Sequence, residues 1–245
     1  MSISKEIKKT KNLSIKTYFL SSFLISNRIS PYISSFYIKK KVIPNRITLH
    51  MILSGIIGAI FFSMPNVILK IIGAIFVHLW FILDCSDGEV ARYTKKYSKY
   101  GKELDYMAHL IDHPLFGFAL FISLYQLERY NFNILLILVV LSNFLDYFNR
   151  NIILLENIID LKESKENKGN IVIHTKWTLK ELVIFIIKIF TIYPNIVLFG
   201  VLVYFIDYFL RTNILFYYIS TNAILSGILS IKAAFSFTRK FYNSY

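Results

Sequence analysis

Residues 67–92 read VILKIIGAIFVHLWFILDCSDGEVAR, an apolar run that ends in a cluster of acidic and small residues. A segment of about 20 predominantly apolar residues is long enough to cross a bilayer as a helix. Ionisable side chains in such a segment are costly to place there and usually serve a function. The stretch therefore predicts a membrane helix that carries acidic side chains to a site at its end.

The composition also indicates a membrane protein. Of the 245 residues, 55% are hydrophobic, yet Lys and Arg number 28 against 15 Asp and Glu. A soluble domain of this size would not normally contain several apolar runs of about 20 residues. Six such runs occur, at 47–64, 67–84, 106–126, 133–154, 191–209 and 214–237. We predict an all-α, polytopic membrane protein with six transmembrane helices.

The N-terminal segment, residues 1–46, is rich in Lys and interleaved with aromatic and aliphatic residues. This pattern favours an amphipathic helix lying on an anionic membrane surface. Because Pro31 and Pro44 interrupt long helices, a disordered basic tail is the alternative. We divide the chain into this segment and a membrane domain, 47–245. Within that domain, 155–178 is predicted to be a polar loop and 179–190 an interfacial segment.

Charge distribution predicts the orientation. Lys and Arg are concentrated in the N-terminal segment, in the predicted loops 85–104 and 155–180, and in the C-terminal tail. Basic residues in short loops remain on the cytoplasmic side of a membrane. We therefore expect both termini and the acidic cluster on the cytosolic side of the cytoplasmic membrane. Since the positive charge follows this topology, it requires no nucleic-acid partner.

The acidic cluster has a fixed spacing. Asp84, Asp87, Gly88, Ala91 and Arg92 are followed by Gly101 and Asp105, which gives D-x2-D-G-x2-A-R-x8-G-x3-D. This pattern resembles the signature of the CDP-alcohol phosphatidyltransferases, membrane enzymes that move a phosphatidyl group from a CDP-linked lipid to an alcohol. Upstream, Pro44-Asn45-Arg46-Ile47-Thr48 is similar to the P-N-x-x-T segment common in that family. The resemblance implies a transferase of phospholipid biosynthesis that forms a homodimer.

The chemistry of such a transfer calls for a metal ion. Breaking a CDP-linked pyrophosphate builds negative charge on phosphoryl oxygens, which divalent cations neutralise. Mg²⁺ and Mn²⁺ prefer carboxylate oxygens and keep positions open for phosphate. We expect Asp84, Asp87 and Asp105 to bind Mg²⁺ or Mn²⁺.

The resemblance also implies a CDP-binding site. It assigns that site to Asp84, Asp87, Gly88, Ala91, Gly101 and Asp105. Arg92 orients acids or phosphate there, or is only a cytosolic positive charge. Thr48 reaches the cytidine side or caps its helix, and capping is the simpler interpretation of Asn45.

One position departs from the family pattern. The last Asp of the signature, taken as the base that deprotonates the acceptor, is His109 here. A neutral imidazole, with an ordinary pKa of about 6.5, can perform that step. Asp105, His109 and Asp112 share one helical face at offsets of four and seven. The alternatives to His109 as base are Asp112, acting directly or by orienting His109, and a catalytically impaired relative.

Two further pairs have more than one interpretation. His109 and His113, four residues apart, have the spacing of a zinc site, although neighbouring aspartates favour a harder ion. Asp146 and Arg150 either pair with each other or bind the acceptor.

The pattern favours an enzyme. The donor is CDP-diacylglycerol or another CDP-linked alcohol, and the acceptor is a small alcohol whose identity the sequence leaves open. The alternative class is a non-enzymatic membrane carrier or binding protein. Such a carrier would place its charges near the bilayer midplane.

Overall fold

The structure is a computed structural model that describes residues 2–10, 20–163, 178–191 and 193–242. All regular elements in these ranges are helical. Six helices have the length and apolarity to cross a membrane. They are α3 (Pro44–Ser63), α4 (Val67–Thr94), α5 (Gly101–Tyr125), α6 (Phe132–Glu163), α8 (Tyr193–Leu210) and α9 (Ile214–Tyr242). The predicted all-α architecture with six spans is confirmed.

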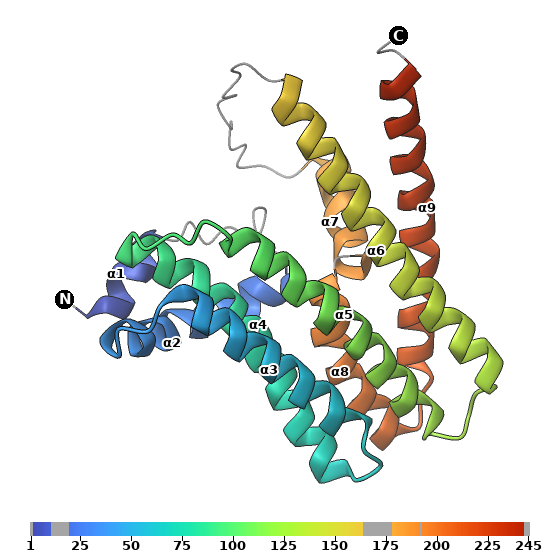
Figure 1. The fold of residues 1–245 in the computed structure, drawn as a ribbon. Coiled ribbons are helices and arrows are strands. Elements are labelled where there is room, and N and C mark those ends of the chain that lie inside the picture. The colour runs from blue at the N-terminus through green and yellow to red at the C-terminus, as the bar shows by residue number, and fades with distance from the viewer. Residues whose placement is uncertain (1, 11–19, 164–177, 192, 243–245) are drawn as a thin grey trace.

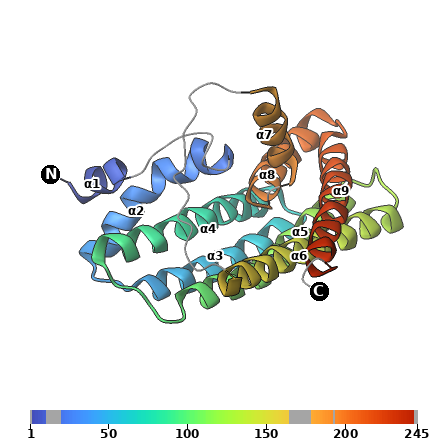
Figure 2. The same cartoon turned by 90° about the horizontal axis from the view of Figure 1, so that it is seen from above.

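Shorter helices precede and interrupt the six spans. At the N-terminus lie α1 (Ile3–Thr10), a π-helical turn η1 (Ser22–Ser26) and α2 (Asn27–Lys39). Figures 1 and 2 show α2 lying along α4, near the end of the bundle where α4 ends and α5 begins. This end is called the motif end below. The helix α7 (Leu179–Thr191) precedes α8.

Two predicted boundaries are wrong. α4 continues as a helix to Thr94 and ends at Lys95, which adopts the left-handed conformation that often terminates helices. The connection to α5 is therefore 95–100 and not 85–104, and the whole stretch 84–92 is helical. α6 also extends to Glu163, so the predicted loop from 155 begins as helix, while 164–177 lies outside the described residues.

Of the two prolines expected to interrupt helices, only Pro44 lies at a helix boundary. Pro31 lies inside α2 and does not end it, whereas Pro44 occupies the first turn of α3, where its missing N–H costs nothing. Pro114 lies inside α5 and cannot donate to the carbonyl of Leu110. Tyr147 of α6 donates from its hydroxyl to that carbonyl at 2.6 Å. A neighbouring helix thus satisfies the backbone group that the proline leaves free.

Small residues bring α3 and α4 together. A Cβ atom on Gly58 would lie 2.9 Å from the Val77 nitrogen, which is too close for any larger residue. Close backbone approach at small residues is a common way for membrane helices to pack. At the far end of this pair, the buried ammonium of Lys70 donates to the Phe62 carbonyl at 2.8 Å. The hairpin is thereby held at both levels, and Lys70 also donates to the Ser123 hydroxyl of α5 at 2.8 Å.

The bundle has two halves. In Figure 1, α3, α4 and α5 run side by side towards the motif end, and α6, α8 and α9 form the other half. Trp80, Phe62 and Phe116 are among the large side chains fully buried between these helices. The packed core holds α4 and α5 in a fixed relation, which determines where the acidic side chains meet.

Candidate active site

Two acids of the sequence motif form one cluster with His109, the residue that differs from the family pattern. Asp84 comes from α4, and Asp105 and His109 come from successive turns of α5. One ligand atom from each lies within 4.8 Å of the other two. His109 Nε2 is 3.4 Å from Asp84 Oδ1 and 3.6 Å from Asp105 Oδ1. The cluster is therefore built across the α4–α5 connection.

Asp87 faces a different partner. Its Oδ2 accepts a 2.7 Å hydrogen bond from the hydroxyl of Thr48 on α3. Asn45 does not cap α3, because the N-cap is Ile43, and its amide instead donates to the Ser98 hydroxyl at 3.0 Å. The P-N-x-x-T segment thus connects α3 both to the motif and to the connection 95–100. The helix-capping interpretation of Asn45 is wrong.

A cavity of about 610 Å³ opens at the motif end and is called the motif cavity. Among its lining residues are Thr48, Asp87, Gly88, Ala91, Arg92, Gly101 and Asp105. Seven residues predicted from the sequence to hold the nucleotide or metal therefore line one space. Asp84 and His109 lie in the cluster that Asp105 joins to this cavity.

Basic side chains from the connection 95–100 and from the start of α5 also line the motif cavity. They are Lys96, Lys99 and Lys102, in addition to Arg92. From the sequence, cytosolic basic charge is expected to help hold an anionic CDP-lipid, but these lysines were not individually assigned to the site. Their closeness to Gly101 in sequence was the available signal, because a connection of six residues must fold over the ends of α4 and α5. Cations at these positions suit a pyrophosphate.

The absence of a side chain at Gly88 lets the Arg92 side chain lie close to the backbone of α4. A Cβ atom placed on Gly88 would lie 3.0 Å from Arg92 Nη1. The guanidinium thus folds back over the glycine, one turn earlier on α4. This contact orients the Arg92 side chain along the wall of the motif cavity.

Asp112 lies deeper and is held by a different set of residues. Its side chain is fully buried, and its Oδ2 accepts a 2.9 Å hydrogen bond from the indole of Trp80. A Cβ atom on Gly55 would lie 2.5 Å from Asp112 Oδ1, so α3 closes over the carboxyl group. Such enclosure leaves little room for an acceptor alcohol. Asp112 is therefore less accessible than the cluster formed by Asp84, Asp105 and His109.

Both ring nitrogens of His113 are hydrogen-bonded. Its Nδ1 is 2.9 Å from Asp146 Oδ2, and its Nε2 is 3.1 Å from Arg150 Nη2. Because arginine only donates, Nε2 accepts and Nδ1–H donates to the carboxylate. Arg150 Nε also donates to Asp146 at 3.2 Å. The Asp146–Arg150 pair is therefore present, and His113 is unavailable for the zinc pair considered with His109.

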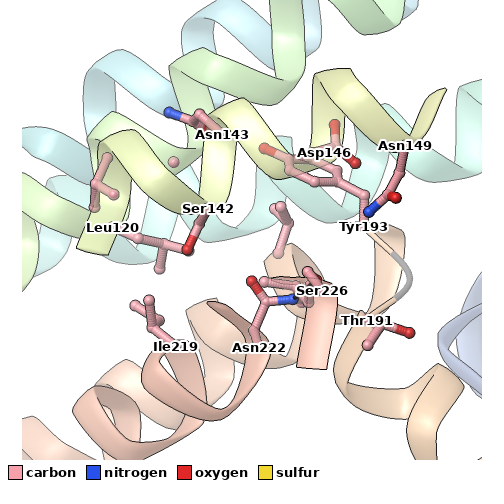
Figure 3. A pocket seen from close by; sticks show the side chains of 14 residues that line it. Leu120, Ser142, Asn143, Asp146, Asn149, Thr191, Tyr193, Ile219, Asn222 and Ser226 are labelled. Atoms are coloured by element: carbon pink, nitrogen blue, oxygen red, sulfur yellow. Dashed lines mark hydrogen bonds between the residues drawn. The ribbon is translucent and has the colours of Figure 1, made fainter. Parts of the chain in front are cut away.

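A second cavity of about 80 Å³ lies below this network, between α5, α6, α8 and α9. Figure 3 shows Ser142, Asp146, Asn222, Ser226 and Tyr193 around it. The Tyr193 ring stacks on His113 at 3.5 Å between centroids. Tyr193 lines the second cavity, and the His113 ring in turn lies 5.0 Å from the His109 ring between centroids. The lining of this cavity is mixed, with polar side chains from α6 and α9 among apolar ones.

The cluster fits a hard divalent cation. Two carboxylates and one imidazole offer three ligands, and their side chains are 45% exposed or less. Carboxylate oxygens suit Mg²⁺ and Mn²⁺, and an imidazole nitrogen is more acceptable to Mn²⁺ than to Mg²⁺. Among the described residues, Asp84, Asp105 and His109 bring their ligand atoms together, and Asp87 lies outside this group.

The chain was compared with known proteins. A search of curated proteins finds no match. A family profile described as CDP-alcohol phosphatidyltransferase matches residues 41–215, a range that includes Thr48, the motif cavity, the acidic cluster and the first five spans. This range is well over half of the 245 residues, and it agrees with the resemblance carried by the motif. The chain belongs to the CDP-alcohol phosphatidyltransferase family.

Proposed function

We propose that this protein transfers a phosphatidyl, or related phospho-alcohol, group from a CDP-linked donor to a small alcohol and releases CMP. Family membership implies CDP-alcohol phosphotransferase activity. The observation that carries the proposal is the joining of the motif cavity to the acidic cluster through Asp105. A nucleotide site and a candidate metal site share this residue.

In this proposal the basic side chains bind the donor's pyrophosphate. Arg92, Lys96, Lys99 and Lys102 line the cavity, and charge-assisted hydrogen bonds to phosphate are strong. Ala91 and Gly101 leave space for the nucleotide beside the helix backbone, and Gly88 leaves space for the Arg92 guanidinium that faces it. Thr48 holds Asp87 and contributes to the cytidine side of the cavity.

The metal would be held by Asp84, Asp105 and Asp87. When bound, a divalent ion neutralises charge that develops on the phosphoryl oxygens. Asp84 and Asp105 already lie in one cluster, and Asp87 lines the same cavity as Asp105. The proposed set is supported by this placement.

His109 receives the proton of the acceptor hydroxyl. Its Nε2 faces Asp84 and Asp105, which would favour the positive charge that the imidazole gains. If His109 instead binds the metal through Nε2, its removal would weaken metal binding as well as turnover. Measurement of both quantities separates the two roles.

The remaining proposals concern the setting of the reaction. Six candidate spans indicate an integral membrane protein. We place both termini and the motif cavity on the cytosolic side, from the distribution of basic residues. A homodimer is proposed by analogy with the family, and so is the division at residue 46.

CMP release tests the proposal. Purified protein is incubated with CDP-diacylglycerol or other CDP-alcohols, Mn²⁺, and a panel of phosphorylated and unphosphorylated alcohols. Release of CMP that depends on both donor and acceptor supports transfer. Tight binding of CDP without release in any combination would instead favour the impaired relative. Failure to bind CDP at all would contradict the donor site.

A further inference from the structure

Glu89 occupies an unspecified position of the D-G-x2-A-R pattern, yet its side chain is buried with only 3% exposure. Two hydroxyls from α2 contact it. Ser30 donates to Oε1 at 2.5 Å, and Ser34 donates to Oε2 at 2.7 Å. The two serines are four residues apart and so lie on the same face of α2. Each carboxylate oxygen therefore has its own donor from one helix.

These contacts act on the helix that carries the motif. Glu89 and Asp87 are two residues apart, which is about 200° around an α-helix. Asp87 faces the motif cavity, and Glu89 faces α2 on the other side of α4. Because both oxygens of the Glu89 carboxyl group accept hydrogen bonds from α2, α4 cannot rotate at this level without breaking them. The contacts with α2 thus fix the direction in which Asp87 and Arg92 point.

We infer that Glu89 is a positioning residue: through Ser30 and Ser34 it makes the N-terminal helix α2 part of the donor site. The inference rests on the proposed function of the motif cavity. It assigns α2 a role beyond contact with a membrane surface, because the helix sets the rotation of the cavity wall. Ser86, also buried, packs at the same junction, with its hydroxyl 3.5 Å from the Ser30 carbonyl.

The first measurement is binding of CDP with Mn²⁺ to the purified full-length protein, by calorimetry in detergent. Glu89→Ala and the double variant Ser30→Ala/Ser34→Ala should each raise the Kd by about tenfold, the scale of one lost hydrogen bond to a charged group. Combining all three changes should add little, because they disrupt the same contact. Glu89→Gln should bind almost normally, since an amide can accept from one serine and donate to the other. Ser35→Ala, at a buried serine about 100° further round α2, is the matched control.

The second measurement uses Cys85, the only cysteine in the chain. It lies one turn before Glu89 on α4 and is partly buried. Loosening of α2 should increase its labelling rate by a membrane-permeant maleimide in Glu89→Ala and in the double serine variant. Glu89→Gln and Ser35→Ala should label at the wild-type rate. Melting temperatures identify any variant that fails to fold. If Glu89→Ala fails to fold, the double serine variant tests the inference.

The results separate three outcomes. The positioning role is supported if the Ala variants show weaker CDP binding and faster Cys85 labelling, and if Glu89→Gln shows wild-type values for both. Faster labelling with unchanged CDP binding overturns it, because the contact would then only attach α2. If the wild-type protein binds no CDP, the proposed function fails. In that case, unchanged Cys85 labelling in the Ala variants would still show that these contacts do not hold α2 against α4.

Discussion

Thr48 Oγ1 donates a 2.7 Å hydrogen bond to Asp87 Oδ2, and this contact joins α3 to the motif of α4. The two residues are 39 positions apart in sequence. The contact occupies one carboxylate oxygen of Asp87. The second oxygen remains available for the metal or for substrate. The first prediction tests this contact.

Thr48→Val keeps the side-chain shape but removes the hydroxyl. A hydrogen bond to a charged group contributes about 1.5–3 kcal/mol, so turnover should fall by about tenfold or more. Thr48→Ser retains the donor and should remain within a few-fold of wild type. CMP release at saturating donor measures both. Equal rates for the Val and Ser variants would mean that the hydrogen bond has no functional role.

Metal dependence is predicted from the acidic cluster. Asp84→Asn and Asp105→Asn should each lower CMP release by more than about 100-fold, because the cation stabilises the transferring phosphoryl group by several kcal/mol. Asp87→Asn should behave in the same way if it completes the metal site. Mn²⁺ binding, measured by electron paramagnetic resonance, should weaken in parallel. Glu128→Gln, in the exposed connection after α5, is the control. Full activity in excess EDTA would contradict the metal site.

The base is tested at His109. His109→Ala should reduce turnover by about 100- to 10,000-fold, the usual contribution of a general base, while CDP binding is retained. Unchanged Mn²⁺ affinity in this variant identifies His109 as a base, and a large loss identifies it as a ligand. His109→Asp restores the family pattern and should recover activity. An active His109→Ala protein combined with an inactive Asp112→Asn protein would assign the base to Asp112.

Packing around Asp112 is tested by Gly55→Ala. The new Cβ atom would lie 2.5 Å from Oδ1 and 2.6 Å from Cγ of Asp112. Overpacking of this kind typically costs about 1–3 kcal/mol, and the melting temperature in detergent should fall. Gly227→Ala is the matched control, because its Cβ atom would be 3.8 Å from the nearest Leu145 atom. Similar melting temperatures for the two variants would show that α3 and α5 can separate at this level.

Orientation is tested by cysteine labelling in a Cys85→Ser background. Ser98→Cys lies in the connection that covers the motif cavity, and Asn131→Cys lies in the connection between α5 and α6. An impermeant thiol reagent applied to intact cells should label Asn131→Cys, while Ser98→Cys should react only after the cells are opened. The reverse pattern would place the motif cavity outside the cell and overturn the proposed orientation.

The sequence by itself determined the six spans and the composition of the site. Apolar runs of this length have few alternatives to membrane helices, because the backbone must satisfy its own hydrogen bonds in lipid. The spacing from Asp84 to Asp105 was sufficient to predict six of the fifteen residues that line the motif cavity. Local rules were less reliable at helix ends, since α4 continued through the polar motif to Thr94.

Only the tertiary structure decided which side chains meet. Thr48 with Asp87, Glu89 with Ser30 and Ser34, and His113 with Asp146 and Arg150 are pairs from different helices. Their contacts depend on the rotation and depth of each helix, which follow from close packing at residues such as Gly58 and Gly55. Hydropathy gives neither quantity, because it records how apolar a segment is and not which neighbour each face contacts.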